Sequence, residues 1–566
     1  MCGIVGIIGE KANINTLKSM LKVQQHRGPD FTGIFQNKNI VLGHNRLSII
    51  DLSEIANQPF ISSNKRYTLV FNGEIYNYLE LKNELITYNF VTNSDTEVLL
   101  AAYIKWGKKC LSKLNGMFSF AIWDSQKEVL FAARDRFGVK PFYYHKTDST
   151  FYFSSEIKTL HETEIEKAPS EKAWANYLVY GSYGMPNETF WENILQLPGG
   201  YFLTYVKGKL SSEKWYFFEK EVLKHQKNES IKKVKSTYKK LLKESIKLRF
   251  RADVKIGFNI SGGLDSSILL AFVNQINTKQ NIKAYTFCTN DERYDELPWV
   301  KQMISLTNNP LSEVILEPNK EIEDKIKYVS DIQDEPFGGI PTVAYSQIFK
   351  QARKEGTIVL LDGQGMDEQW AGYDYYTQQG DATIQGVRKS PFRTNVLRTG
   401  FLKLAEKPVY PKPFNNRILD MQYRDLFYTK IPRALRFNDR ISMAYSTELR
   451  EPFLDYRLVE FAFAQPLKYK INKRVQKYLL RELASEYLGN TITYAPKRPL
   501  QTPQREWLGG ELKKFVTDNL DKLKSSEYSK WFNSMELDKE WELYLAGNND
   551  ASFHIWQWVN LSLILR

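Results

Sequence analysis

Cysteine and histidine are scarce in this sequence. Three of its 566 residues are cysteine and six are histidine. Three cysteines cannot form a disulfide framework, so we expect a reducing compartment. The histidines lack the spacing of metal ligands, which argues against a structural zinc site.

Long apolar runs are also missing. No apolar stretch approaches the roughly 20 residues that cross a bilayer. The apolar first residues reach Glu10 without a preceding basic segment, which argues against a secretory signal. We therefore expect a cytoplasmic protein with no membrane partner.

Positive charge, by contrast, is in excess. Lys and Arg number 78 against 65 Asp and Glu, a net charge of +13. Such a balance is typical of many nucleic-acid-binding proteins. However, both signs are interspersed, and the Lys-rich segment 231–247 has the pattern of a solvated helix face. No recognised nucleic-acid module accompanies the charge, so we expect no nucleic-acid partner and keep an RNA-binding or RNA-modifying protein as a remote alternative.

Short strands with few helices are expected over the first 200 residues. Runs rich in β-branched and aromatic residues occupy positions 67–71, 118–123, 129–133 and 201–206. Helical periodicity occurs at 14–25 and 94–106. This pattern predicts antiparallel sheet with layered helices. The polar, weakly patterned stretch 211–230 marks the expected boundary between domains at 2–212 and 230–566.

Strands alternate with helices after this boundary. Residues 254–260 have the pattern of a strand that runs into a glycine turn, and an apolar helix follows over 267–276. Further strands are expected at 283–289, 313–317 and 357–362. This alternation predicts a parallel, doubly wound sheet. The aromatic-rich region after Gly372 is predicted to be helical.

Cys2 is the first candidate for chemistry. It follows the initiator methionine, whose removal a small second residue usually permits. The thiol would then lie beside a free α-amine with a pKa of about 7.7–8.0. Such an amine can act as the general base for its own side chain. Taken alone, Cys2 is better explained as a small apolar residue in an N-terminal strand.

Five motifs surround this cysteine in the first domain. They are HRGPD at 26–30, RLSIID at 46–51, FNGEIYN at 71–77, SDTE at 94–97 and RDRFGVKP at 134–141. In this order they resemble the class II glutamine amidotransferase domain, the glutaminase of asparagine synthetases. The resemblance implies an αββα antiparallel sandwich of the Ntn-hydrolase type.

The resemblance also implies roles for the matching residues. Cys2 would attack the glutamine side-chain amide, and Asn72 with the backbone N–H of Gly73 would form the oxyanion hole. Arg46 would pair with the substrate α-carboxylate, while two carboxylates would hold its α-ammonium. The glutamine pocket would comprise Arg46, Leu47, Ser48, Ile49, Ile50, Asn72, Gly73, Glu74 and Asp95.

A glycine-rich segment, SGGLDSS at 261–267, follows a predicted strand and opens a helix. Glycines let the backbone approach phosphate oxygens, and a helix N-terminus favours negative charge. The segment is neither a P-loop nor a GxGxxG fingerprint. It resembles the pyrophosphate loop of N-type ATP pyrophosphatases, which split ATP into AMP and pyrophosphate. Asp265 supplies a carboxylate for Mg²⁺ beside the phosphates.

The segment LLDGQGMDEQWAGY at 360–373 resembles the second nucleotide segment of the same family, usually SGEGSDE. Asp367 would be the second Mg²⁺ ligand. The expected ATP-binding residues are Asn259, Ser261, Gly262, Gly263, Leu264, Asp265, Ser266, Ser267, Thr289, Asp362 and Gly363, the last two through their backbone. Residues 440–455 match the synthetase core, and Lys497 aligns with a lysine that stabilises charge during adenylation. The resemblance implies a doubly wound parallel sheet like that of adenine nucleotide alpha-hydrolases, followed by a helical C-terminal part.

The second nucleotide segment departs from the family pattern. Asp362 stands where Ser is usual, Gln364 where Glu is usual and Met366 where Ser is usual. In asparagine synthetases that Glu is tied to forming and using β-aspartyl-AMP. Glutamine cannot accept a proton near pH 7, although its amide can still orient an acyl-adenylate. Asn259 likewise replaces a commonly aliphatic residue.

The resemblance implies a glutamine-dependent asparagine synthase that uses glutamine, aspartate, ATP and Mg²⁺. Its catalytic residues would be Cys2, Asn72, Gly73, Gln364 and Lys497. The segment 333–342, QDEPFGGIPT, helps to shape the acceptor pocket and departs from the family continuation. The alternative is the same chemistry on another carboxylate, such as a sugar uronic acid for a surface polysaccharide. The oligomeric state stays open, with a homodimer among the alternatives.

Overall fold

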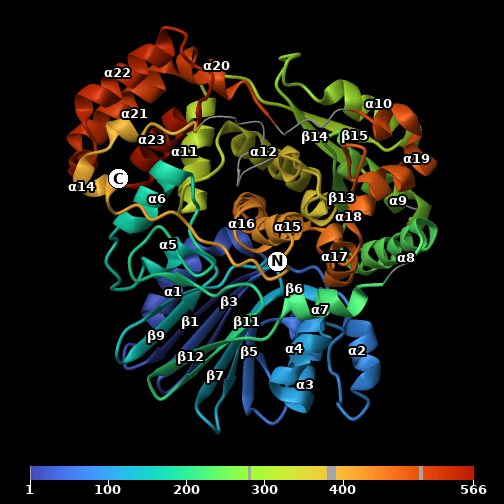
Figure 1. Ribbon diagram of the computed structural model, residues 1–566. Coiled ribbons are helices and arrows are strands. Elements are labelled where there is room, and N and C mark those ends of the chain that lie inside the picture. Colours follow the sequence, from blue (N-terminus) through green and yellow to red (C-terminus); the bar gives the residue numbers. More distant parts are fainter. Residues whose placement is uncertain (1, 228, 278–281, 379–389, 496–500) are drawn as a thin grey trace.

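The computed structural model describes residues 2–227, 229–277, 282–378, 390–495 and 501–566. The chain forms two units in contact. The antiparallel sheets of the first lie at the bottom of Figure 1, and the helices and parallel strands of the second lie above them. Among the described residues, no helix combines the length and apolarity that crossing a membrane would need.

Among the described residues, the first unit contains two antiparallel sheets of six strands each. Their strand orders are β10-β8-β9-β1-β3-β2 and β12-β11-β7-β6-β5-β4. The first sheet contains β1 (Gly3–Gly9), β2 (Phe31–Asn37), β3 (Ile40–Arg46), β8 (Tyr143–Lys146), β9 (Thr150–Ser154) and β10 (Leu195–Gln196). The second contains β4 (Phe60–Ile61), β5 (Tyr67–Ile75), β6 (Gly116–Asp124), β7 (Val129–Arg134), β11 (Tyr201–Val206) and β12 (Lys209–Lys214).

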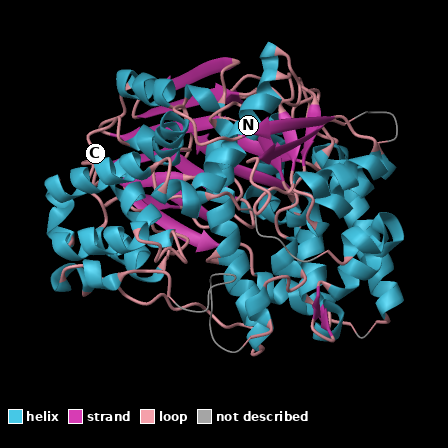
Figure 2. Ribbon diagram, turned by 90° about the horizontal axis from the view of Figure 1, so that it is seen from above, coloured by secondary structure: helices cyan, strands magenta, loops and turns pink. Residues whose placement is uncertain are grey.

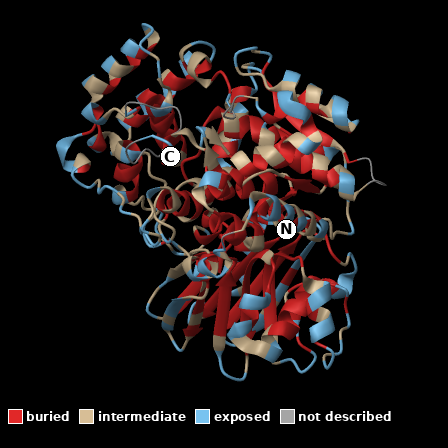
Figure 3. Ribbon diagram, turned by 45° about the vertical axis from the view of Figure 1, so that its right-hand side comes forward, coloured by how far each residue is buried: buried red, intermediate tan, exposed pale blue. Residues whose placement is uncertain are grey.

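The alternation of side chains along the strands explains why these sheets form four layers with their helices. In β1, Ile4 and Ile8 pack between the sheets, whereas Val5 and Ile7 face α1 (Ile14–Val23). The outer face of the second sheet is covered by α2 (Tyr78–Glu84), α3 (Asp95–Trp106) and α4 (Cys110–Lys113). Both sheets are therefore largely buried (Figure 3), and the predicted αββα sandwich is confirmed.

The second unit contains a parallel sheet of five strands in the described residues, in the order β15-β14-β13-β16-β17. These strands are β13 (Ile256–Asn259), β14 (Ala284–Cys288), β15 (Leu311–Ile315), β16 (Val359–Leu361) and β17 (Glu448–Arg450). The chain order reverses between β13 and β16. In open parallel sheets, ligands bind in the crevice at the carboxyl ends of the strands beside such a switch point. The predicted doubly wound sheet is confirmed, and β17 is a buried strand that the sequence pattern did not indicate.

Most of the rest of the second unit is helical (Figure 2). The helices include α8 (Ile231–Arg249), α9 (Leu264–Ile276), α10 (Leu297–Thr307), α11 (Ile322–Gln333), α12 (Ile340–Lys354), α13 (Met366–Gln369), α14 (Thr399–Leu402), α15 (Arg417–Phe427) and α16 (Lys430–Met443). The C-terminal part adds α17 (Tyr456–Phe463), α18 (Leu467–Lys470), the hairpin β18 (Ile471–Asn472) and β19 (Val475–Gln476), α19 (Tyr478–Thr493), α20 (Gln504–Gly509), α21 (Lys513–Ser525), α22 (Ser534–Leu545) and α23 (Phe553–Ile564).

The expected boundary stretch, 211–230, is more ordered than its polar sequence indicates. It contains the end of β12 and the helix α7 (Phe218–His225). Phe218 is 1% exposed, and its ring contacts Phe463 edge to face and Tyr423 in a stack. Short helices α5 (Ile157–Leu160) and α6 (Glu171–Tyr180) precede it. The stretch therefore packs against both units, because Phe218 contacts the second unit while the Trp215 ring stacks on Phe118 of the first.

Candidate active sites

Cys2 lies directly before β1. Its sulfur lies 3.9 Å from the Leu47 carbonyl oxygen. The Cys2 backbone nitrogen, which methionine removal would turn into the α-amine, donates to Asn72 Oδ1 at 3.1 Å. Arg27 Nε donates to the Cys2 carbonyl oxygen at 3.1 Å. Burial raises the pKa of the thiol, so nucleophilic attack requires a neighbouring base such as this amine.

The open edge of β5 presents hydrogen-bond donors beside Cys2. β4 pairs only with residues 68 and 69, which leaves the later edge of β5 uncovered by a strand. There the N–H groups of residues 71 and 75 donate to the side chains of Gln58 and Asp95, at 2.7 and 2.8 Å. Alternate N–H groups of a strand point to the same edge, so that of Gly73 lies between them. Asn72 Nδ2 is buried without a hydrogen-bond partner among the described residues, and both groups can donate to an oxyanion.

Glu74 and Asp95 place two carboxylates in the same region, and each residue is 4% exposed. Burial raises the pKa of Asp95 to about 7. It also raises the pKa of Glu74, which faces the carboxylate of Glu448. Arg450 NH2 lies 3.5 Å from Glu74 Oε2 and opposes that rise. An entering ammonium group would favour the ionised carboxylates, in keeping with the predicted role.

Arg46 ends β3, and loop 51–57 already engages its guanidinium. Its Nη1 donates to the Ser53 carbonyl oxygen at 2.9 Å and to Asn57 Oδ1 at 2.7 Å. Its Nη2 donates to the Asp51 carbonyl oxygen. Recognition of a substrate α-carboxylate by both terminal nitrogens would therefore share or displace these contacts.

The loop at 47–50 connects the glutamine pocket with the second unit. Leu47, Ile49 and Ile50 are buried, and the Ser48 N–H donates to Asp30 Oδ2 at 2.8 Å. The Ile49 carbonyl oxygen accepts from the backbone N–H of Asp253 at 2.8 Å. Residues 47–50 of the predicted pocket therefore lie near Cys2, on a loop that the second unit contacts.

A second cavity, of about 420 Å³, lies at the carboxyl ends of β13 and β16, where the strand order predicts a ligand. Of the residues predicted for ATP, metal or catalysis, it is lined by Ser261, Gly262, Gly263, Leu264, Asp265, Ser266, Asp362, Gly363, Gln364 and Asp367. Three other predicted residues, Asn259, Ser267 and Thr289, are buried and do not line it. Lys497 lies outside the residues that the structure describes.

Lys477 joins the two carboxylates predicted to bind metal. Its Nζ lies 2.7 Å from both carboxylate oxygens of Asp265 and 2.6 Å from Asp367 Oδ1. The two carboxylates, from α9 and α13, therefore converge on one cation. Oxygen donors of this kind suit Mg²⁺, so the arrangement fits the predicted metal. No local pattern indicates a role for Lys477, because Asp265 is 212 positions away in the chain.

We call the cavity of about 420 Å³ the nucleotide cavity, after the ligand predicted for it. A larger cavity, of about 1360 Å³, adjoins it, and both are lined by Lys430 and Arg433 of α16. Burial lowers the pKa of Lys430 to about 7. Glu335 and Thr342, from the segment expected to shape the acceptor pocket, also line the larger cavity. The structure therefore places the predicted acceptor segment beside the nucleotide segment.

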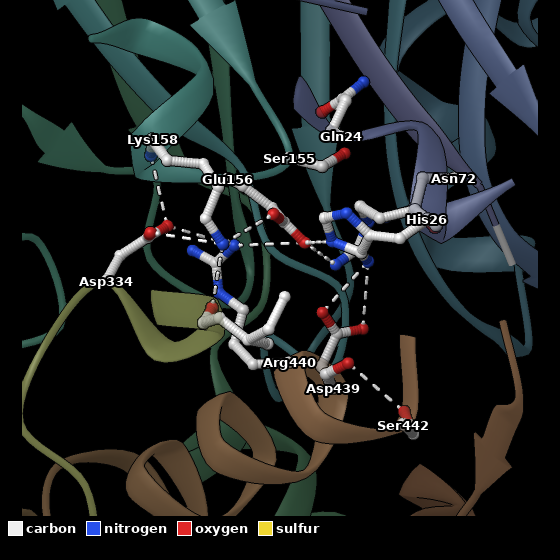
Figure 4. A network of polar contacts seen from close by, with 12 residues as sticks. Gln24, His26, Asn72, Ser155, Glu156, Lys158, Asp334, Asp439, Arg440 and Ser442 are labelled. Carbon is white, nitrogen blue, oxygen red and sulfur yellow. Dashed lines mark hydrogen bonds and ion pairs between the residues drawn. The ribbon is translucent and has the colours of Figure 1, made fainter. Parts of the chain in front are cut away.

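A buried ionic network lies between the two units (Figure 4). Glu156, from the first unit, contacts His26, Arg27 and Lys158 at 3.0, 2.9 and 3.2 Å. Arg440 of α16 lies 3.4 Å from the same carboxylate. Burial alone would raise the pKa of Glu156, but its interactions with His26, Lys158 and Arg440 hold it well below its usual range.

The network also reaches the nucleophile. Arg27, which holds the Cys2 carbonyl oxygen, lies 2.9 Å from Asp439 Oδ2 on α16. Arg440 lies 3.5 Å from Asp334, at the acceptor segment. α16 thus contacts the surroundings of Cys2 near its end and lines both cavities near its start. Arg27 belongs to the HRGPD motif, but the sequence indicates no role for it, because its partner Asp439 is 412 residues away.

Comparison with known proteins agrees with this geometry. Residues 1–216 match the family described as glutamine amidotransferase domain. Residues 237–566, more than half of the chain, match the family described as asparagine synthase. The chain belongs to the asparagine synthase family.

Two relatives from Bacillus subtilis (strain 168) show how far the similarity extends. The protein named asparagine synthetase (glutamine-hydrolyzing) 3 is 29% identical over 542 residues, which are 88% of this chain and 86% of that protein. Asparagine synthetase (glutamine-hydrolyzing) 1 is 26% identical over 613 residues, covering 98% of this chain and 95% of that protein. Similarity to asparagine synthase family members therefore spans both units.

Proposed function

We propose that this member of the asparagine synthase family is a glutamine-dependent asparagine synthase. Glutamine would be hydrolysed at Cys2, and the released ammonia would amidate a carboxylate activated by ATP. The products are asparagine, glutamate, AMP and pyrophosphate. The names of both relatives favour aspartate over a uronic acid as the acceptor.

At the first site, Cys2 supplies the thiolate that attacks the glutamine amide carbon. The α-amine freed by methionine removal accepts the thiol proton. Asn72 Nδ2 and the Gly73 N–H stabilise the oxyanion that develops on the amide oxygen. When the C=O bond re-forms, the C–N bond breaks and the α-ammonium of Cys2 gives its proton to the departing ammonia. Water then hydrolyses the thioester, which releases glutamate and restores the thiol. Glu74 and Asp95 hold the α-ammonium of glutamine. The buried position of Cys2 excludes bulk water from the thioester until ammonia has left.

At the second site, the glycine loop 261–267 and the start of α9 bind the phosphates of ATP. Asp265 and Asp367 would hold Mg²⁺, which when bound neutralises phosphate charge and assists departure of pyrophosphate. Lys477 keeps the two carboxylates together. Lys430 and Arg433 lie where the nucleotide and acceptor cavities meet, and they can pair with anionic groups of either substrate.

The observation that carries the proposal is the joining of the two candidate sites by one helix. α16 contacts Arg27 beside Cys2 and lines the nucleotide cavity. Separate glutaminase and adenylating enzymes would not require this connection. A single enzyme that transfers ammonia between the sites does require it.

The test is to incubate the full-length protein with ATP and Mg²⁺, with and without aspartate, and to measure pyrophosphate and asparagine. Glutamine and ammonium are supplied in parallel. We expect aspartate-dependent pyrophosphate with equimolar asparagine from both nitrogen sources. Cys2→Ala is the matched control, and it should keep the ammonia reaction and lose the glutamine reaction. Glutamate release without aspartate-dependent pyrophosphate would contradict the proposal and direct the search to other carboxylates.

A further inference from the structure

Amide formation at the second site requires a group that accepts a proton. When ammonia attacks the acyl carbon of an acyl-adenylate, its nitrogen becomes positively charged. The nitrogen must lose a proton before the tetrahedral intermediate collapses to a neutral amide. Position 364 lines the nucleotide cavity but is glutamine, whose amide cannot accept that proton. Some other residue must do so, if the proposed function is correct.

Most carboxylates that line the nucleotide cavity are committed to other contacts. Asp265 and Asp367 hold Lys477. Glu368 accepts a hydrogen bond from Tyr373 Oη at 2.6 Å. Glu296 directly precedes α10 and lines the nucleotide cavity but not the larger one. Asp362, at the carboxyl end of β16, differs from these four carboxylates because the tyrosine that donates to it lines the larger cavity.

Asp362 stands where the two cavities meet. Its carboxylate accepts hydrogen bonds from Tyr345 Oη and from the Gly363 N–H. Asp362 lines the nucleotide cavity, whereas Tyr345, on α12, lines the larger cavity. The hydrogen bond from Tyr345 to Asp362 therefore links a residue of the larger cavity to a residue of the nucleotide cavity. Asn259 Nδ2 donates to the same Tyr345 oxygen and fixes it from β13.

Two departures from the family pattern thus contact one tyrosine. Asn259 replaces a commonly aliphatic residue and Asp362 replaces a serine. The chain has gained a carboxylate at 362 and lost one at 364, two residues along the same segment. Burial raises the pKa of Asp362 above its ordinary value, which makes this carboxylate a stronger base than an exposed aspartate.

We propose that Asp362 is the general base for ammonia attack in this chain and that Tyr345 is its positioning residue. The ammonia lone pair forms the C–N bond while the carbonyl π electrons move to oxygen. Asp362 takes one proton from the nitrogen. The oxygen electrons then re-form the C=O bond, and the C–O bond to AMP breaks with its electron pair leaving on AMP. The proton held by Asp362 passes to solvent with the products.

The experiment separates adenylation from amide formation in the full-length protein. Aspartate-dependent exchange of labelled pyrophosphate into ATP reports adenylation, and asparagine formed from ammonium reports the whole reaction. Wild-type exchange belongs to the proposed function and is measured first. We expect Asp362→Ser and Asp362→Asn to lower asparagine formation by about 10²–10⁴-fold, while exchange stays within about threefold of wild type. Tyr345→Phe should lower asparagine formation less.

Rescue by the reciprocal change provides the decisive comparison. The double variant Asp362→Ser with Gln364→Glu restores a carboxylate to the segment at the usual family position. We expect the double variant to form asparagine at least tenfold faster than Asp362→Ser does. Parallel loss of exchange and asparagine formation in Asp362→Asn would overturn the proposal, because it would indicate a role in nucleotide binding. Unchanged asparagine formation in Asp362→Asn would overturn it as well.

Discussion

At Cys2, the backbone nitrogen and the carbonyl oxygen each have a partner that fixes their direction. Asn72 Oδ1 holds the backbone nitrogen, and Arg27 holds the carbonyl oxygen. Gly73 has φ +152°, and a Cβ there would lie 2.1 Å from the Met117 carbonyl oxygen. Only glycine therefore fits between Asn72 and Glu74. Preorganisation of this kind is what makes an oxyanion hole effective, since the donors need not move during reaction.

Asn72→Ala should lower kcat for glutamine hydrolysis by about 10²–10³-fold, because it removes one oxyanion donor. The KM for glutamine should change little, and ammonia-dependent synthesis should be unaffected. Steady-state glutamate release measures the first effect. Ser119→Ala, at the cross-strand position opposite Asn72, is the matched control and should retain activity. Equal losses in both variants would point to general damage of the sheet.

Asp95 should make glutamine binding depend on pH. Burial raises its pKa to about 7, so the carboxyl is neutral in free enzyme below that pH and ionised above it. Only the ionised form attracts the substrate α-ammonium. The KM for glutamine should therefore fall by about tenfold between pH 6 and pH 8, in proportion to the ionised fraction. Asp95→Asn should raise the KM and flatten this profile; a flat profile in wild-type enzyme would contradict the assignment.

Among the elements, α16 connects the two chemistries. Lys430 and Arg433 at its start line the nucleotide cavity, and Asp439 and Arg440 near its end contact the first unit. The helix is 14 residues long, about 21 Å at 1.5 Å per residue. If ligand binding shifted the N-terminal end of α16, the contact between Asp439 and Arg27 would therefore change as well. This is a physical route for coupling between the sites.

Asp439→Asn should uncouple the two sites. The substitution keeps the shape of the side chain but removes the charge that pairs with Arg27 at 2.9 Å. We expect the ratio of glutamate to pyrophosphate to rise above one, while ammonia-dependent synthesis stays within about threefold of wild type. Both products are quantified in the same reaction. An equal loss with glutamine and ammonia would show that Asp439 serves only to stabilise α16.

On the scale of the whole molecule, the interface is charged where most protein cores are apolar. Arg440 is 1% exposed, and it contacts Glu156 across the interface and Asp334 within the second unit. Its guanidinium also lies 5.0 Å from the centre of the Tyr143 ring. Buried ion pairs of this type add little net stability over apolar packing, but removing one partner leaves an uncompensated charge.

Arg440→Met should therefore lower the free energy of unfolding by about 3–5 kcal/mol. Urea denaturation followed by tryptophan fluorescence measures the change. Lys514→Met is the matched control. It breaks the exposed pair with Asp518 and should leave the midpoint unchanged, because exposed pairs contribute little. Similar midpoints for the two variants would contradict a structural role for the buried network.

Sequence by itself determined the two classes of chemistry and the order of the units. Strand and helix patterns are set by neighbouring residues, so β5, α1, α3 and the parallel strands β13 to β16 were predictable. Motifs such as SGGLDSS contain their own backbone requirements within seven residues. The stretch 211–230 was less predictable, because α7 is held by Phe463 and Tyr423, far along the chain.

Tertiary structure alone decided which residues meet. Lys477 reaches Asp265 across 212 positions and Arg27 reaches Asp439 across 412, and no local pattern encodes such distances. The raised pKa of Asp95 and Asp362 likewise depends on burial by elements that are remote in sequence. Chemical type is a property of the residue, whereas reactivity is a property of the surroundings that the fold assembles around it.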